Sequence, residues 1–154
     1  GGDTLFTNMN AAYERLSEEM KRAISGMTAV HDIARVFAKR LGKPPEELHD
    51  KYPPQEHPVV RTHPETSEQT LYVNGAFTSH INGLSTAESD WLLDRLYRTA
   101  HDPEIQCRFR WRAGSIAFWD NRACQHFAVS DYYPARRVME RATIAGDRPF
   151  YRAD

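Results

Sequence analysis

The sequence lacks long hydrophobic runs and any strong excess of charge. No apolar stretch in its 154 residues approaches the roughly 18 residues that span a membrane, and we expect no signal peptide. The formal net charge is −1 and the basic residues form no stripe, so nothing favours binding to nucleic acid or to an anionic membrane. We therefore expect one cytoplasmic domain that acts on small molecules.

The short motifs of several enzyme classes are also missing. The sequence contains no G-x-S-x-G, P-loop, G-x-G-x-x-G or C-x-x-C pattern, which argues against hydrolase, phosphoryl-transfer and dinucleotide-binding functions. Only two cysteines occur, Cys107 and Cys124, each among apolar neighbours in a predicted strand. We expect buried free thiols, and a disulfide between them is the alternative.

Helical periodicity marks three segments, mostly in the first two thirds of the chain. Apolar residues recur at helical spacing over 8–26, where Asn8 or Asn10 can cap the helix, and again over 30–41. A capping box at Ser85 predicts a third helix over 85–100, with Trp91 on its apolar stripe.

Strand-like patterns dominate the rest of the sequence. The predicted strands are 59–62, 70–73, 105–111, 116–119, 123–129 and 137–144. Helices that precede a largely antiparallel β portion indicate an α+β fold, in which the sheets close as a barrel or jelly roll.

His126 is the first candidate for chemistry. It lies on the predicted strand 123–129, where its neighbours of the same parity, Cys124 and Ala128, are small and leave room beside the imidazole. A metal ligand is one interpretation. A hydrogen-bonded core or surface histidine is the other.

Two arginines on the following predicted strand form a candidate anion site. Arg137 and Arg141 share parity, with Cα atoms roughly 13 Å apart at about 3.3 Å per residue. Their guanidinium groups suit carboxylate or sulfonate, so together they could hold a dianion. Because Arg136 and Glu140 charge the opposite face, a solvent-exposed face remains the alternative.

The other histidines show no ligand pattern that we accept. His63-Pro64-Glu65 matches H-x-D/E, but its proline predicts a turn. His31-Asp32 and His49-Asp50 are adjacent pairs on predicted helical segments, so neither pair converges on a metal. Three more histidines are expected to face solvent: His57, His80 and His101.

Several blocks in order resemble one family. These are Gly1–Leu5, Thr62–Thr66, Leu71–Asn74, Trp119–Arg122 with Gln125-His126, and Arg137–Asp147. They resemble the TauD/TfdA family of Fe(II)- and 2-oxoglutarate-dependent dioxygenases, which share a double-stranded β-helix (jelly roll) with flanking helices. The family's H-x-D metal pair would precede Gly1, so the resemblance implies that residues 1–154 form the C-terminal portion of one such domain.

The resemblance assigns roles to six side chains. It implies that His126 is a metal ligand, that Thr4 and Arg137 bind 2-oxoglutarate, and that Arg141, Phe37 and Phe77 surround the substrate. For Phe37, packing within its predicted helix is an equally good interpretation.

The resemblance also implies which reaction the complete enzyme catalyses and what this chain lacks for it. The complete enzyme would use Fe(II), O₂ and 2-oxoglutarate to hydroxylate a small anionic substrate, taurine or a related sulfonate, with release of sulfite and an aldehyde. With one ligand of three, this chain alone is expected to be inactive, and its uncovered sheet edges favour association, including homo-oligomers. The alternative is a non-catalytic β module that binds an anion or a partner protein.

Overall fold

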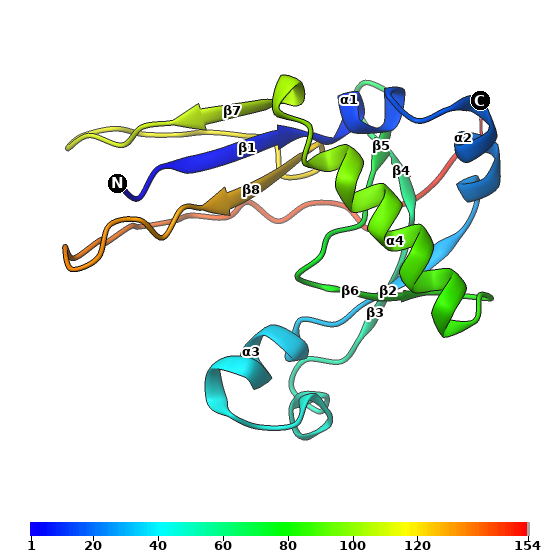
Figure 1. Ribbon diagram of the computed structural model, residues 1–154, viewed down its shortest axis with the longest axis horizontal. Helices are drawn as coiled ribbons and strands as arrows, with labels where there is room; N and C mark the ends of the chain where they lie inside the picture. Colours follow the sequence, from blue (N-terminus) through cyan, green and yellow to red (C-terminus); the bar gives the residue numbers. More distant parts are fainter. Residues whose placement is uncertain (154) are drawn as a thin grey trace.

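Three small antiparallel sheets form the framework of the computed structural model, which describes residues 1–153 (Figure 1). The first sheet has the order β7 (Gln106–Phe109), β1 (Thr4–Asn8), β8 (Cys124–Ala128). The second has the order β3 (Gln55–Pro58), β2 (Thr28–His31), β6 (Thr78–Ile81), and the third pairs β4 (Val60–Thr62) with β5 (Gln69–Leu71).

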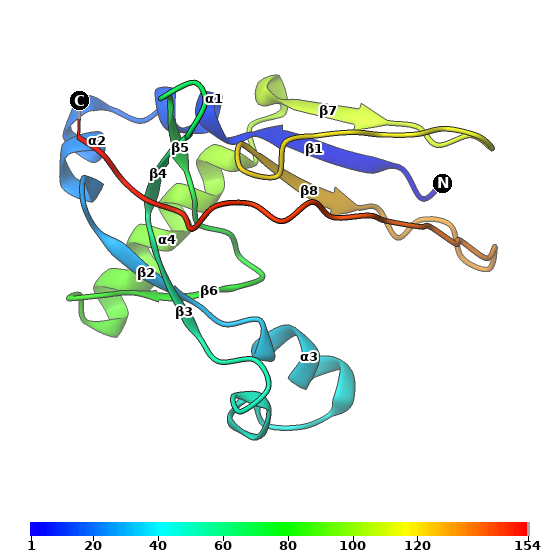
Figure 2. The ribbon, with the colours of Figure 1, turned by 180° about the vertical axis from the view of Figure 1, so that it is seen from behind.

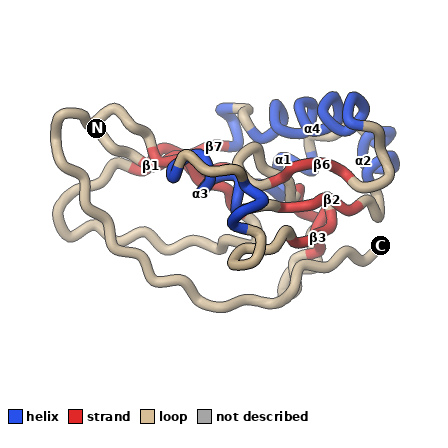
Figure 3. The backbone as a smooth tube through the Cα atoms, turned by 90° about the horizontal axis from the view of Figure 1, so that it is seen from below, coloured by secondary structure: helices blue, strands red, loops and turns tan. Residues whose placement is uncertain are grey.

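Four α-helices accompany the sheets in this part of the chain. They are α1 (Met9–Glu14), α2 (Glu18–Ile24), α3 (Ala34–Leu41) and α4 (Thr86–Ala100), and short 3-10 helices span Pro45–Leu48 and Pro103–Ile105. Figure 3 shows α4 running alongside β6. The buried hydroxyl of Ser89 on α4 accepts the backbone N–H of Ile81 at 2.9 Å, which fixes this contact.

The helix predictions are confirmed at their caps and wrong at two boundaries. The capping box between Ser85 and Glu88 is present. The predicted helix 8–26 is two helices, because Ser17 caps α2 and so starts a new helix. The predicted helix 30–41 begins too early: Val30 lies on β2, and α3 starts at Ala34.

Four of the predicted strands are confirmed to within two residues at each end, as β4, β5, β7 and β8. Two predictions are wrong, since 116–119 and 137–144 run extended without a strand partner among residues 1–153. In Figure 1, where the colours follow the sequence, these segments belong to the long loops before and after β8 that project beyond the sheet β7-β1-β8.

The apolar core lies where α1 and α4 meet the sheets. Its largest fully buried side chains include Met9, Ile24, Leu71, Ile81 and Leu96. The prediction for Trp91 is wrong: on α4 it is 62% exposed, and the buried stripe runs through Leu92, Leu93, Leu96 and Ala100.

The two cysteines are unpaired, as predicted, but the prediction that both are buried is wrong. Cys107 is exposed, because β7 is an edge strand, and Cys124 is half-buried. Among residues 1–153, no helix is both long enough and apolar enough to cross a membrane.

The last residues of the chain run back along β4 (Figure 2). The N–H of Thr62 donates to the carbonyl of Phe150 at 2.8 Å, and the N–H of Arg152 donates to the Thr62 hydroxyl at 2.8 Å. Arg61 Nη2 contacts both carboxylate oxygens of Asp147 at 2.8 Å. We call residues 147–152 the C-terminal strap.

Candidate metal and anion site

The register of the first sheet places His126 and Thr4 on the same face. His126 on β8 lies opposite Phe6 on β1, and Thr4 lies opposite Ala128. Directly paired residues of antiparallel strands project to the same side, and so do residues two apart on one strand. The predicted metal ligand and a predicted 2-oxoglutarate contact therefore share one surface.

Two aromatic rings flank the imidazole of His126. The Trp119 ring centroid lies 5.2 Å from that of His126 and 4.9 Å from that of Phe6. His126 is exposed beyond them, and neither of its ring nitrogens has a hydrogen-bond partner among residues 1–153. The ring is held in place and its nitrogens are free, which fits a metal ligand.

The surroundings of His126 also favour its neutral form. Partial burial beside the aromatic rings lowers the pKa of His126, and the nearby positive charge of Arg141 lowers it further. A neutral imidazole is the form that binds a metal. Arg141 itself is exposed.

The Thr4 side chain is buried and oriented by an indole. Thr4 is 5% exposed, and its hydroxyl oxygen accepts the Nε1–H of Trp111 at 2.9 Å. Because this bond uses an oxygen lone pair, the hydroxyl hydrogen remains available to an anionic acceptor. Trp111 lies beyond the end of β7, and the sequence patterns did not identify it as part of the site.

Arg137 is anchored by one of its nitrogens. Its Nε–H donates to the carbonyl of Gly2 at 2.9 Å, and its guanidinium lies 5.9 Å from the Tyr132 ring centroid. Within residues 1–153, its two terminal nitrogens form no hydrogen bond or ion pair. They are therefore free to bind a carboxylate as a fork.

Neither phenylalanine forms a ring contact with His126 within residues 1–153. Phe37 on α3 packs against Tyr52 with ring centroids 4.9 Å apart, and Figures 1 and 2 show α3 well separated from β8. Phe77 is partly exposed in the turn before β6, where its carbonyl accepts the N–H of Asp32. Packing explains Phe37 here, and the substrate roles of both residues stay predictions.

Among the other histidines, His63 lies in the predicted turn, which the structure confirms, but it is buried and bonded to Asp120. His31 lies on strand β2 and not on a helix. The prediction for His57 is wrong: it is half-buried, because its ring packs edge-on against His31 and Tyr72. His80 and His101 are exposed, as predicted.

The described residues do not complete a metal site. Among residues 1–153, no group of three or more His, Cys, Asp or Glu side chains could hold an ion. His126 fits one ligand position, and a stable Fe(II) site needs further converging ligands.

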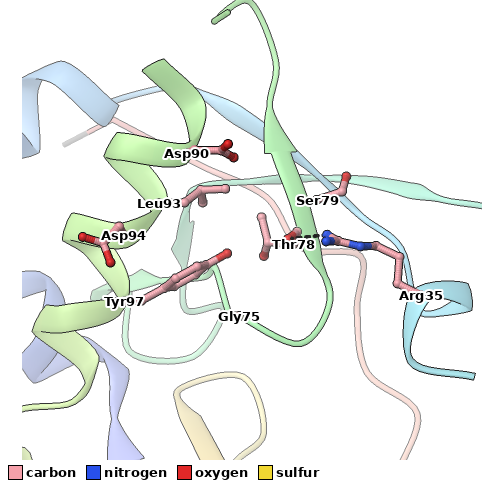
Figure 4. A pocket seen from close by; sticks show the side chains of 8 residues that line it. All are labelled: Arg35, Gly75, Thr78, Ser79, Asp90, Leu93, Asp94 and Tyr97. Carbon is pink, nitrogen blue, oxygen red and sulfur yellow. Dashed lines mark hydrogen bonds between the residues drawn. The ribbon is translucent and has the colours of Figure 1, made fainter. Parts of the chain in front are cut away.

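A separate hollow of about 280 Å³ lies between α4 and the turn that leads into β6 (Figure 4). Arg35 borders one side and Asp90, Asp94 and Tyr97 border the other, with Thr78 between them. None of the side chains around His126 lines it, so it is distinct from the candidate site.

Comparison with known proteins identifies the family. The model of the family described as "Taurine catabolism dioxygenase TauD, TfdA family" matches residues 1–143. The chain belongs to this family.

Three similar proteins illustrate the match. An alpha-ketoglutarate-dependent sulfate ester dioxygenase of Pseudomonas putida is 37% identical over 97% of this chain and 52% of its own length. The crystal structure of a taurine dioxygenase from Burkholderia xenovorans has a TM-score of 0.74 at 41% identity, covering 88% of this chain and 43% of that one. The structure of AAD-2 in complex with Mn(II) and N-oxalylglycine reaches a TM-score of 0.84 at 29% identity, over 97% and 59% of the two chains.

These likenesses confirm the predicted α+β jelly-roll class, of which the three sheets described above form part. The chain spans about half or less of the length of three curated relatives, at 39%, 52% and 49%.

Proposed function

We propose that residues 1–154 are the C-terminal portion of an Fe(II)- and 2-oxoglutarate-dependent dioxygenase domain that hydroxylates a small anionic substrate, most simply taurine or a related sulfonate. The observation that carries the proposal is the imidazole of His126, which packs against Trp119, forms no hydrogen bond within residues 1–153 and lies on the same face as Thr4. Membership of the TauD/TfdA family supports it.

The chain's own residues would bind the two anions. The Thr4 hydroxyl and the free terminal nitrogens of Arg137 suit the distal carboxylate of 2-oxoglutarate. Arg141 would neutralise the sulfonate near His126, and Phe37 and Phe77 would border the substrate. His126 would supply one metal ligand.

When bound, iron with 2-oxoglutarate and O₂ would supply the oxidation: one oxygen atom goes to the substrate, the other to succinate, and CO₂ is released. Hydroxylation of the carbon next to a sulfonate gives a product that collapses to sulfite and an aldehyde. Because the described residues offer one metal ligand, we expect the complete reaction to require residues beyond this chain. The two free thiols suit the cytoplasmic setting that the sequence predicts.

A non-catalytic anion-binding module is the second candidate, and the missing ligand cluster favours it. One experiment separates the two. Succinate and sulfite formation are measured with Fe(II), 2-oxoglutarate and taurine for this chain and for a form extended to the length of the relatives. We expect turnover from the extended form alone. No turnover from it with taurine, an alkyl sulfate or a carboxylate analogue would favour the binding module.

A further inference from the structure

The turn after β4 carries a buried histidine whose tautomer is fixed. His63 Nδ1 accepts the backbone N–H groups of Glu65 at 3.3 Å and Thr66 at 3.2 Å. Nδ1 therefore carries no proton, and the neutral ring must carry its hydrogen on Nε2. That Nε2–H donates to the carboxylate of Asp120 at 3.1 Å, 57 residues further along the chain.

Asp120 lies in the loop that leads into β8, and it is held from two sides. Besides His63, its carboxylate accepts the backbone N–H of Arg122 at 2.8 Å and the guanidinium of the same residue at 2.8 Å. Arg122 also lies 3.6 Å from Glu65, so a second charged contact joins the loop to the turn. At its other end, the loop is tied to the start of α1, where the N–H of Met9 donates to the carbonyl of Ala123 at 2.9 Å.

The loop ends are fixed, and the residue just before Asp120 covers the imidazole of the candidate site. Trp119 packs against both His126 and Phe6. Because His126 has no hydrogen bond of its own within residues 1–153, ring packing is what sets its orientation. A shift of Asp120 would move the adjacent Trp119 and release the imidazole.

We propose that His63 and Asp120 are positioning residues: their hydrogen bond holds the loop 119–123 so that Trp119 fixes the orientation of His126. Its importance for catalysis rests on the proposed function, in which His126 is a metal ligand. The hydrogen bond and the ring contact belong to this chain alone, and both can be measured without a metal.

Two substitutions of His63 test its two hydrogen-bonding roles separately, as acceptor in the turn and as donor to Asp120. His63→Asn keeps an acceptor near Nδ1 for the turn and loses the donor to Asp120. His63→Gln keeps a donor near Nε2 and loses the turn acceptor. Both remove the buried ring, so both are expected to lower stability, and a general loss of packing would affect the two variants alike.

The measurement is nuclear magnetic resonance of the isotope-labelled 154-residue chain, reading the cross-relaxation peaks between the Trp119 indole and the His126 ring. We expect these peaks to be lost in His63→Asn and retained in His63→Gln. Peaks that survive in His63→Asn, or that disappear equally in both variants, would overturn the proposal.

Two further variants support the measurement. If His63→Asn does not fold, Asp120→Ala cuts the same bond from its other end and should lose the same peaks. The control is Asp94→Asn on α4, which removes the charge from the exposed pair with Arg98 and should leave the peaks unchanged. Failure of turnover in the extended form would overturn the proposed function and leave this result standing.

Discussion

The Nε–H of Arg137 donates to the carbonyl oxygen of Gly2 at 2.9 Å, although the two residues are 135 positions apart in the sequence. This bond ties the loop after β8 to the residues just before β1. The bond occupies Nε and leaves the two terminal guanidinium nitrogens free to bind a ligand.

The first prediction concerns the two terminal nitrogens of Arg137. In the extended form, Arg137→Ala should weaken binding of 2-oxoglutarate or N-oxalylglycine about 10- to 100-fold, since a charge-assisted pair contributes roughly 1.5–3 kcal/mol. Titration calorimetry measures the dissociation constant. Arg136→Ala is the control, because Arg136 is exposed and has no contact with Gly2 among the described residues. An unchanged affinity in Arg137→Ala would refute the assigned role.

The second prediction tests why glycine precedes β1. Gly2 has φ +75°, and a Cβ there would lie 2.8 Å from Arg137 Cδ, whereas Gly26 has φ +71° with open space around it. Gly26→Ala should cost about 1 kcal/mol for the left-handed backbone alone. Gly2→Ala should cost more, because Arg137 must also move. Urea unfolding compares the two variants, and equal costs would show that the contact is unimportant.

The third prediction concerns the C-terminal strap. The Arg61 side chain is 4% exposed and pairs with Asp147, which is partly exposed. Asp147→Ala leaves a buried guanidinium without its carboxylate and should lower the free energy of unfolding by about 2 kcal/mol. Asp94→Ala breaks the exposed Arg98–Asp94 pair and should cost less than about 0.5 kcal/mol. If the two losses match in urea unfolding, the strap does not depend on this pair.

The fourth prediction is a pH dependence centred on His31. Burial lowers its pKa to about 4, with help from the nearby His57. An unfolded histidine has a pKa of about 6.5, so the unfolded chain binds the extra proton first as the pH falls. The free energy of unfolding is therefore unaffected by His31 above about pH 6.5. It falls between about pH 6.5 and pH 4, by roughly 3 kcal/mol in total.

Replacing His31 should remove this acid sensitivity. His31→Gln should lose less stability than the unmodified chain between about pH 7 and about pH 4.5. Urea unfolding followed by circular dichroism at both pH values measures the difference. His101→Gln, at an exposed position, serves as the control and should behave like the unmodified chain. Equal acid sensitivity in His31→Gln would contradict the prediction.

Local signals in the sequence were reliable where local physics decides the structure. The hydroxyl of Ser85 caps α4 because Glu88 is three residues away, and no distant contact is required. Val30 shows the limit. Its spacing fits a helix, but pairing with His80 and Glu56 places it in the centre of a sheet. The prediction of a strand over 137–144 is wrong for the opposite reason. Its residues alternate as in a strand, but no strand of the described chain pairs with them.

The candidate site likewise has features that the sequence indicated and features that only the structure reveals. The parity of His126 and the family resemblance indicated a site on one face of β8, and the register of the sheet places Thr4 on that face as well. The bond between His63 and Asp120 spans 57 residues and depends on how a turn meets a loop. No periodicity or spacing in the sequence encodes such a contact, so the structure alone reveals it.

The contact between Trp119 and His126 gives the molecule an optical reporter of its own site. An imidazole that becomes charged or takes up a metal quenches the emission of an indole that it touches. Trp111 has to stay, because it orients Thr4. With Trp91 replaced by phenylalanine, a change in the remaining fluorescence would report protonation or metal uptake at His126, without a dye and before any product forms.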